Sequence, residues 1–165
     1  MSTATPARLW EETVEPAWVD YNGHMNVAYY VLIFDHATEA LQAIIGMDEA
    51  ERDSSGSSMF VAEAHITYDN EVLEGERVYI TTQVLDSDEK RLHLFHRMYS
   101  CSDDRLCATN ELMILQVNLR TRKVGPFPDP VRARINTIRS EHALIEKPSQ
   151  SSRIIAIPKR PAANT

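Results

Sequence analysis

The period of the apolar residues changes between residues 46 and 60, from the spacing of a helix to the alternation of a strand. After Asn26, apolar side chains recur every three or four residues until Gly46, which predicts one long amphipathic helix with Asn26 as its N-cap. From residue 60 to residue 68, apolar and polar side chains alternate, which predicts a strand with Glu63 and His65 on a polar face. A helix followed by strands implies a sheet that covers the helix.

Turn-forming runs divide the rest of the chain into short predicted elements. The runs Asp-Ser-Asp-Glu-Lys and Ser-Asp-Asp are typical of tight turns, so the strands that they separate are expected to form antiparallel hairpins. Residues 48–58 are polar and rich in Ser, which predicts a loop. The predicted strands are residues 9–14, 77–85, 91–100 and 106–119, and a second helix is predicted at residues 131–145.

The size and charge of the chain exclude several classes of protein. A chain of 165 residues with 43% hydrophobic content buries one core, so we expect one domain. The formal net charge of -7 argues against a nucleic-acid partner, because phosphate is bound by Lys and Arg. No apolar run is long enough to span a membrane, and residues 1–7 lack an apolar signal core, so we expect a cytoplasmic protein.

Two cysteines, Cys101 and Cys107, lie six residues apart where a strand, a turn and a strand are predicted. They are close enough in sequence to face each other across a hairpin. Because thiols stay reduced in the cytoplasm, free thiols are the expected state.

The run from Asp20 to Asn26 reads Asp-Tyr-Asn-Gly-His-Met-Asn and lies between the first predicted strand and the long helix. Pro16 breaks the strand before it, which places the run on a loop. The run brings a carboxylate, an imidazole and two side-chain amides beside a helix N-terminus, whose unpaired N–H groups stabilise a developing oxyanion. This combination predicts cleavage of an ester-like bond.

Each polar residue of this run has a candidate catalytic role. Asp20 is a general base for water or a nucleophile that forms a mixed anhydride, and the residues leave both roles open. His24 is a candidate donor to the carbonyl or to the leaving group. Asn22 is a candidate for positioning the attacking water. The predicted oxyanion site consists of Asn26 as the cap and the backbone N–H groups of Val27 and Ala28. The alternative interpretation is a purely structural turn, which Asn-Gly favours.

Two stretches of the chain resemble the hotdog-fold thioesterases. The residues similar to the strand-to-helix signature of that family are Asp20, Asn22, His24, Asn26, Tyr29 and Tyr30. Residues 60–78 are similar to its second strand and the turn that follows, although the turn here is a residue longer. The resemblance implies an α+β hotdog fold over residues 8–145, in which an antiparallel sheet wraps one long central helix. We expect a flexible N-terminus at residues 1–7 and an extended tail at residues 146–165.

The resemblance also implies a reaction and its partners. It implies hydrolysis of an acyl-CoA thioester to the free acid and coenzyme A, without a cofactor, by a homodimer or homotetramer. Residues 19–26 and 90–98 look like the betainyl-CoA thioesterases of carnitine breakdown, which implies a quaternary ammonium on the substrate. Two other classes remain as alternatives: a hotdog acyl-CoA hydratase or dehydratase, and a non-catalytic acyl-binding module.

A quaternary ammonium group is bound by aromatic faces and carboxylates. The candidate substrate-binding residues are Trp18, Tyr21, Tyr29, Tyr30, Glu63 and Glu71. His93 and His96 are three residues apart on a predicted strand, so they point to opposite faces, and we expect no metal site.

Overall fold

The long predicted helix is present as α1 (Val27–Ile45) in a computed structural model that describes residues 5–157. The Asn26 side chain caps α1 by accepting a hydrogen bond from the Ala28 N–H at 3.0 Å. Gly46 ends the helix in the left-handed conformation, with a φ of 79°, so both predicted ends are confirmed. The buried face of α1 consists of Tyr30, Ile33, Phe34, Ala37, Thr38, Leu41 and Ile45.

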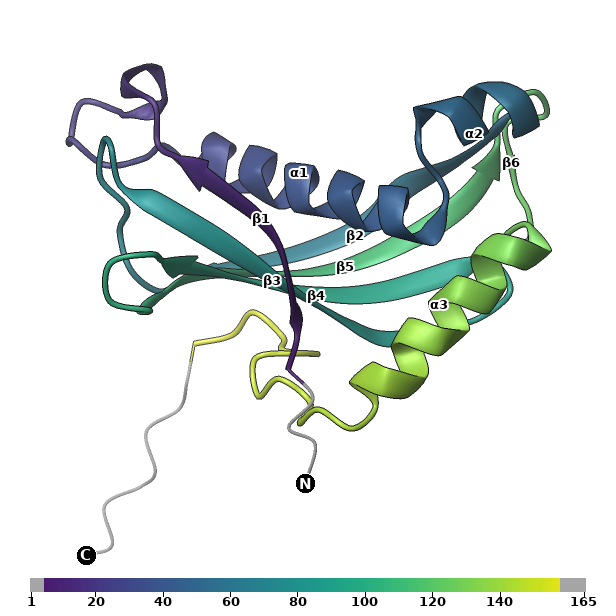
Figure 1. Cartoon of the computed structure of the whole chain (residues 1–165). Helices are drawn as coiled ribbons and strands as arrows, with labels where there is room; N and C mark the ends of the chain where they lie inside the picture. Colours follow the sequence, from purple (N-terminus) through teal and green to yellow (C-terminus); the bar gives the residue numbers. More distant parts are fainter. Residues whose placement is uncertain (1–4, 158–165) are drawn as a thin grey trace, which may run out of the picture.

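One antiparallel sheet curves around α1 (Figure 1). Its strands lie in the order β1-β3-β4-β5-β2, and β6 pairs with β5. β3 pairs with β4 and β4 with β5, which confirms the predicted hairpins. The strands are β1 (Ala7–Thr13), β2 (Ser57–Tyr68), β3 (Arg77–Ser87), β4 (Arg91–Ser100), β5 (Leu106–Asn118) and β6 (Lys123–Val124). The predicted α+β architecture, with a sheet wrapped around one long helix, is therefore confirmed.

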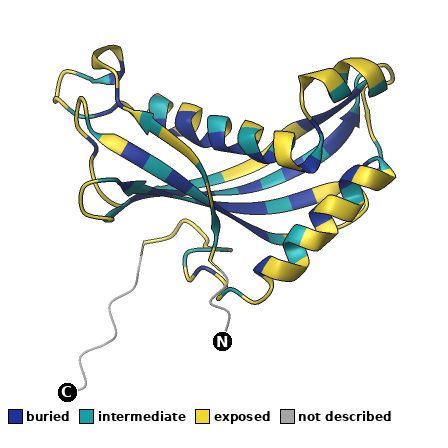
Figure 2. Ribbon diagram, viewed as in Figure 1, coloured by how far each residue is buried: buried dark blue, intermediate teal, exposed yellow. Residues whose placement is uncertain are grey.

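The core consists of two apolar clusters between α1 and the sheet. Phe34 belongs to the cluster nearer the start of α1, and Leu41 belongs to the cluster nearer its end. The second predicted helix is present as α3 (Asp129–His142), which packs against β3 and adds Ile135 to the second cluster. Figure 2 shows the buried residues on the strands of the sheet and the exposed residues on the outward faces of α2 and α3. The core therefore holds the whole length of α1 in place.

His96 is fully buried in this core, whereas His93 lies at the surface of the same strand. The His96 ring lies 3.1 Å from the Thr38 hydroxyl and 2.8 Å from the Thr82 hydroxyl. Burial lowers the pKa of His96 to about 3, so its imidazole is neutral near pH 7. His93 pairs instead with Glu111 at 2.7 Å. The predicted opposite orientation of the two imidazoles is confirmed, and residues 5–157 contain no cluster of His, Cys, Asp and Glu suited to a metal ion.

Two predictions about the middle of the chain are wrong. The predicted loop at residues 48–58 contains the helix α2 (Glu49–Ser55), which Asp48 caps by accepting from the Glu51 N–H at 2.9 Å. None of the residues of α2 is buried, so the apolar stripe that reveals a helix in a sequence is missing. In β2, residues 60–64 are exposed on both faces of the strand, not on the polar face alone. The alternation of apolar and polar residues in this stretch therefore does not mark a face that packs on the core of this subunit.

Several smaller expectations are resolved in the described part of the chain. Cys101 and Cys107 are both free. Within residues 5–157, no helix is both long and apolar enough to cross a membrane. Residues 1–4 and 158–165, which belong to the predicted flexible N-terminus and extended tail, lie outside the described residues. Residues 146–157 form neither helix nor strand.

Candidate active site

The run before α1 folds into a tight turn that fixes the backbone of Asp20. The Gly23 N–H donates to the Asp20 carbonyl at 3.0 Å, and the Asp20 N–H donates to the His24 carbonyl at 2.9 Å. Gly23 has a φ of 81°, a left-handed conformation that Gly adopts without strain. The Asn22 N–H donates to Asp20 Oδ1 at 2.8 Å, so the turn interpretation of this run is correct for its backbone.

The same turn also leaves Asp20 available for chemistry. Asp20 is partly buried, and within residues 5–157 its Oδ2 has no hydrogen-bond partner. Asp20 and His24 line a cavity of about 290 Å³ together with Val27, the first residue of α1. The structural and catalytic interpretations of the run are thus compatible, because one carboxylate oxygen holds the turn and the other has no hydrogen-bond partner within residues 5–157.

The start of α1 offers one backbone donor to this cavity. Val27 is the first helical residue, so its N–H has no acceptor within the helix. The Ala28 N–H, by contrast, already donates to Asn26 Oδ1, so the predicted oxyanion site of two N–H groups is corrected to one. Asn26 is a cap, as predicted. The positive end of the helix dipole adds to the effect of the Val27 N–H on a developing oxyanion.

The loop between β2 and β3 supplies another wall of the cavity. The Met25 N–H donates to the Val72 carbonyl at 2.8 Å, which joins the turn to the loop that follows β2. Glu71 on this loop lies 3.1 Å from His24, measured between Glu71 Oε2 and His24 Nε2. Both side chains are well exposed, with 42% exposure for His24 and 61% for Glu71. The contact orients the imidazole towards the cavity that both residues line.

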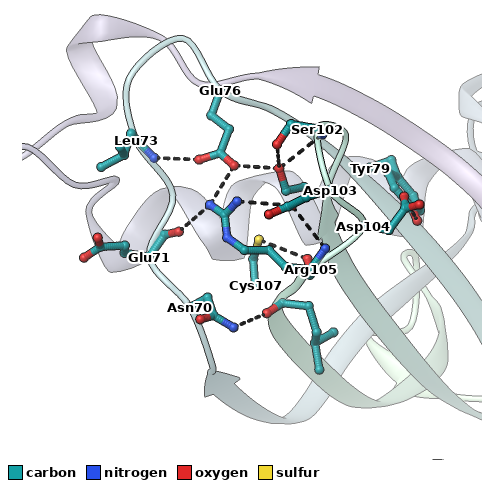
Figure 3. Close-up of polar contacts among 12 residues, drawn as sticks. Asn70, Glu71, Leu73, Glu76, Tyr79, Ser102, Asp103, Asp104, Arg105 and Cys107 are labelled. Atoms are coloured by element: carbon teal, nitrogen blue, oxygen red, sulfur yellow. Dashed lines mark hydrogen bonds and ion pairs between the residues drawn. The ribbon is translucent and has the colours of Figure 1, made fainter.

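An ion pair behind this loop holds it in place (Figure 3). Arg105 pairs with Glu76 at 2.7 Å and donates to the Glu71 carbonyl at 3.0 Å. Glu76 also accepts from the Ser100 hydroxyl at 2.6 Å and from the Leu73 N–H at 3.1 Å. Burial by itself would raise the pKa of the Glu76 carboxyl, but these hydrogen bonds and the Arg105 charge lower it overall. Glu76 is therefore an ionised anchor for the backbone between residues 71 and 73.

The predicted aromatic residues do not all reach the cavity. Tyr30 lines it, and burial raises the pKa of its hydroxyl to about 12. Trp18 is buried and stacks on Tyr29 at a ring-centroid distance of 5.3 Å, so the two rings occupy each other rather than the cavity. Tyr21 is 96% exposed at the tip of the turn. Among the four predicted aromatic residues, Tyr30 is thus the one placed beside Asp20.

Glu63 and Asn22 also lie away from the position that the sequence predicts for them. Glu63 lines a separate cavity of about 300 Å³ on the outer side of the sheet, with His65, His93 and Glu111. It is separated from Asp20 because residue 63 lies in mid-strand, whereas the loop beside the turn begins at the end of β2. Asn22 does not line the cavity of Asp20, and its contact with Asp20 is made by its backbone N–H.

Sequence reasoning missed several residues that line the cavity of Asp20. Tyr68 packs edge-on against Tyr30 at a centroid distance of 5.2 Å, and Asp69 and Asn70 follow it at the end of β2. Met25, on the turn itself, was also missed. The available signal was the break of the alternating pattern after Tyr68, where two polar turn-forming residues end the strand.

Fold and site together define a class of enzyme. An antiparallel sheet wrapped around one long helix, with a carboxylate, an imidazole and a free N–H at the start of that helix, defines the hotdog-fold thioesterases. The chain matches the model of the thioesterase-like superfamily over residues 14–135. It therefore belongs to this superfamily, and it is a thioester hydrolase.

Individual relatives agree with this membership. The chain is 42% identical to a betainyl-CoA thioesterase of Pseudomonas aeruginosa, over 90% of this chain and 94% of the relative. It is 37% identical to an L-carnitine dehydrogenase/betainyl-CoA thioesterase of Rhizobium meliloti, over 93% of this chain but only 31% of that longer protein. A Staphylococcus aureus protein solved in complex with CoA superposes with a TM-score of 0.87 at 30% identity, covering 96% of this chain and 100% of that one.

Proposed function

We propose that this chain hydrolyses betainyl-CoA to betaine and coenzyme A, with Asp20 as the general base. The supporting observation is that Asp20, His24 and the first N–H of α1 share one cavity of about 290 Å³. Asp20 Oδ2 takes a proton from water as the water oxygen bonds to the thioester carbon. The Val27 N–H and the helix dipole stabilise the oxyanion. The C–S bond then breaks, His24 gives a proton to the leaving thiolate, and transfer of the proton from Asp20 to His24 restores both groups.

The choice of the acyl group is supported by the relatives. The two relatives that are 42% and 37% identical over at least 90% of this chain are a betainyl-CoA thioesterase and an L-carnitine dehydrogenase/betainyl-CoA thioesterase. The CoA-bound relative supports coenzyme A as the carrier of the acyl group. The proposed substrate is therefore a small acyl-CoA whose acyl group ends in a trimethylammonium ion.

Thiol release from a panel of acyl-CoA substrates tests this function. We expect the highest kcat/KM with betainyl-CoA, compared with acetyl-CoA, butyryl-CoA and hexanoyl-CoA at the same pH and ionic strength. The cationic acyl group complements the acidic lining of the cavity, which the uncharged acyl groups do not. Faster hydrolysis of any uncharged short acyl-CoA would exclude betainyl-CoA as the preferred substrate.

We also propose that the chain forms a homodimer through the free edge of β2. β2 is an outer strand of the sheet, and residues 60–64 are exposed on both of its faces. Phe60 and Val61 are exposed apolar side chains in this part of β2. Burying an apolar strand edge against a second copy removes this surface from water and pairs the unpaired backbone groups.

The mass of the chain in solution tests the proposed dimer. Sedimentation equilibrium is expected to give twice the chain mass of 18.7 kDa for the wild type. Replacing Val61 with Glu places a charge on the edge and is expected to shift the population to the single chain mass, whereas Val124→Glu, at an exposed residue of β6, is not. A wild type that stays monomeric at all concentrations would exclude the dimer.

A further inference from the structure

We propose that Tyr68, Asp69 and Glu71 form the subsite for the cationic end of the acyl group. This inference rests on the proposed function and names the residues that would give it its preference for a cation. All three residues line the cavity that also contains Asp20. They lie on the end of β2 and on the loop after it, and Glu71 also contacts His24 of the turn at 3.1 Å.

The first argument is the charge of the cavity. Three carboxylates line it, those of Asp20, Asp69 and Glu71. None of the nine lining residues, all within the described chain, is Lys or Arg. Such a cavity attracts a cationic acyl group and repels an anionic one. Asp20 is assigned to the reaction and Glu71 orients His24 at 3.1 Å, so Asp69 is the carboxylate left to contact the substrate cation, and Glu71 adds negative charge to the same cavity.

The second argument is the short reach of the acyl group. In a betainyl group, a single methylene separates the quaternary nitrogen from the thioester carbon. When the carbonyl oxygen lies at the Val27 N–H, the trimethylammonium ion must therefore lie in the same cavity. Tyr68 is 49% exposed and has Tyr30 beside it, so aromatic surface is available to the methyl groups at this position.

The third argument is that the subsite is formed before substrate arrives. The N–H groups of Asp69 and Asn70 both donate to the Cys107 carbonyl, at 2.8 and 3.0 Å. The Thr67 hydroxyl donates to Asp69 Oδ2 at 3.0 Å, which leaves Oδ1 for a ligand. Arg105 holds the Glu71 carbonyl at 3.0 Å. Since these bonds fix the backbone of residues 69–71, little ordering is needed when the cation binds.

A pair of matched substrates tests the subsite. Betainyl-CoA and 3,3-dimethylbutanoyl-CoA have the same shape, but carbon replaces the charged nitrogen in the second. The measured quantity is the ratio of their kcat/KM values, in which effects on the catalytic residues cancel. We expect Asp69→Asn and Tyr68→Leu each to lower this ratio about tenfold, the scale of one charge or cation–π contact in a partly enclosed site. Glu74→Gln, an exposed carboxylate change in the same loop but outside the cavity, is expected to leave the ratio unchanged.

Free betaine as an inhibitor of the uncharged substrate gives a second measurement. We expect betaine to inhibit the wild type and to inhibit Asp69→Asn about tenfold less. Hydrolysis of the uncharged substrate shows that each variant is folded. A ratio that stays at the wild-type value in both variants, or a wild type with no preference for the cation, overturns the subsite and leaves thioester hydrolysis intact. A wild type that hydrolyses neither substrate overturns the proposed function itself.

Discussion

Replacing Asp20 with Asn is expected to lower kcat/KM for betainyl-CoA by about 10² to 10⁴, the range over which positioned general bases act. The amide keeps the size of the carboxylate and its acceptor oxygen, so the bond from the Asn22 N–H and the turn itself remain. What is lost is the Oδ2 atom that is proposed to take the proton from water. Thiol release from the substrate measures the rate, and thermal unfolding shows that the fold is retained.

The controls for this variant separate the remaining interpretations. Asp35→Asn removes an exposed carboxylate from α1 and is expected to leave the rate unchanged. If Asp20→Asn hydrolysed the substrate at the wild-type rate, a non-catalytic acyl-binding role would be favoured for this run. A single wild-type turnover in ¹⁸O-labelled water tests the nucleophile role of Asp20, because water that opens a mixed anhydride at the Asp20 carboxyl carbon leaves the first product unlabelled. An unlabelled first product would therefore exclude direct attack of water on the thioester.

Replacing Arg105 with Met is expected to lower the free energy of unfolding by about 2 kcal/mol, because a mostly buried carboxylate loses its counter-ion. Glu76, which is 15% exposed, would keep its bonds to Ser100 and Leu73 but would lose the guanidinium. The loop that carries Glu71 would also lose the bond to its carbonyl, so kcat/KM is expected to fall about tenfold. Denaturant unfolding and thiol release measure the two effects.

An exposed ion pair provides the matched control for Arg105. Arg132→Met breaks the pair with Asp129 on α3, whose side chains are 43% and 86% exposed, and is expected to change the free energy of unfolding by less than about 0.5 kcal/mol. Adding Glu76→Gln to Arg105→Met removes the unpaired charge and is expected to restore part of the lost stability. Equal effects of Arg105→Met and Arg132→Met would show that the network does not anchor the loop.

The parts of the fold that follow local rules are those that the sequence predicts. α1 has an apolar stripe, a capping Asn26 and a terminating Gly46, so its position and both ends are predictable. The hairpins are marked by turn residues and alternation. α2 is missed because it buries none of its residues. The exposure of residues 60–64 is missed because alternation shows that a strand has two unlike faces, and does not show which of them the subunit covers.

The candidate site also has a part that the sequence predicts and a part that it does not. Asp20, His24 and Val27 lie close together in the chain, between residues 20 and 27, so a short run of sequence predicts their proximity. Tyr68 and Asp69 are more than forty residues away and reach the cavity through the pairing of Met25 with Val72. Such contacts depend on sheet register, which a single sequence does not specify for a loop. The sequence also predicts Trp18 and Tyr29 as substrate-binding residues, because it does not show that these two rings stack on each other.

The two edges of the sheet differ in what they offer to another molecule. β1 ends one edge with seven residues and carries the charged side chains of Arg8, Glu11 and Glu12, whereas β2 ends the other with twelve residues and a largely apolar stretch at residues 60–64. In the proposed dimer, two copies pair their β2 edges about a two-fold axis, so both of these edges are covered. The β1 edges that stay uncovered carry charged side chains, which oppose the pairing of further copies. If the proposed dimer forms, this difference between the two edges predicts that a concentrated solution of the protein does not grow into filaments.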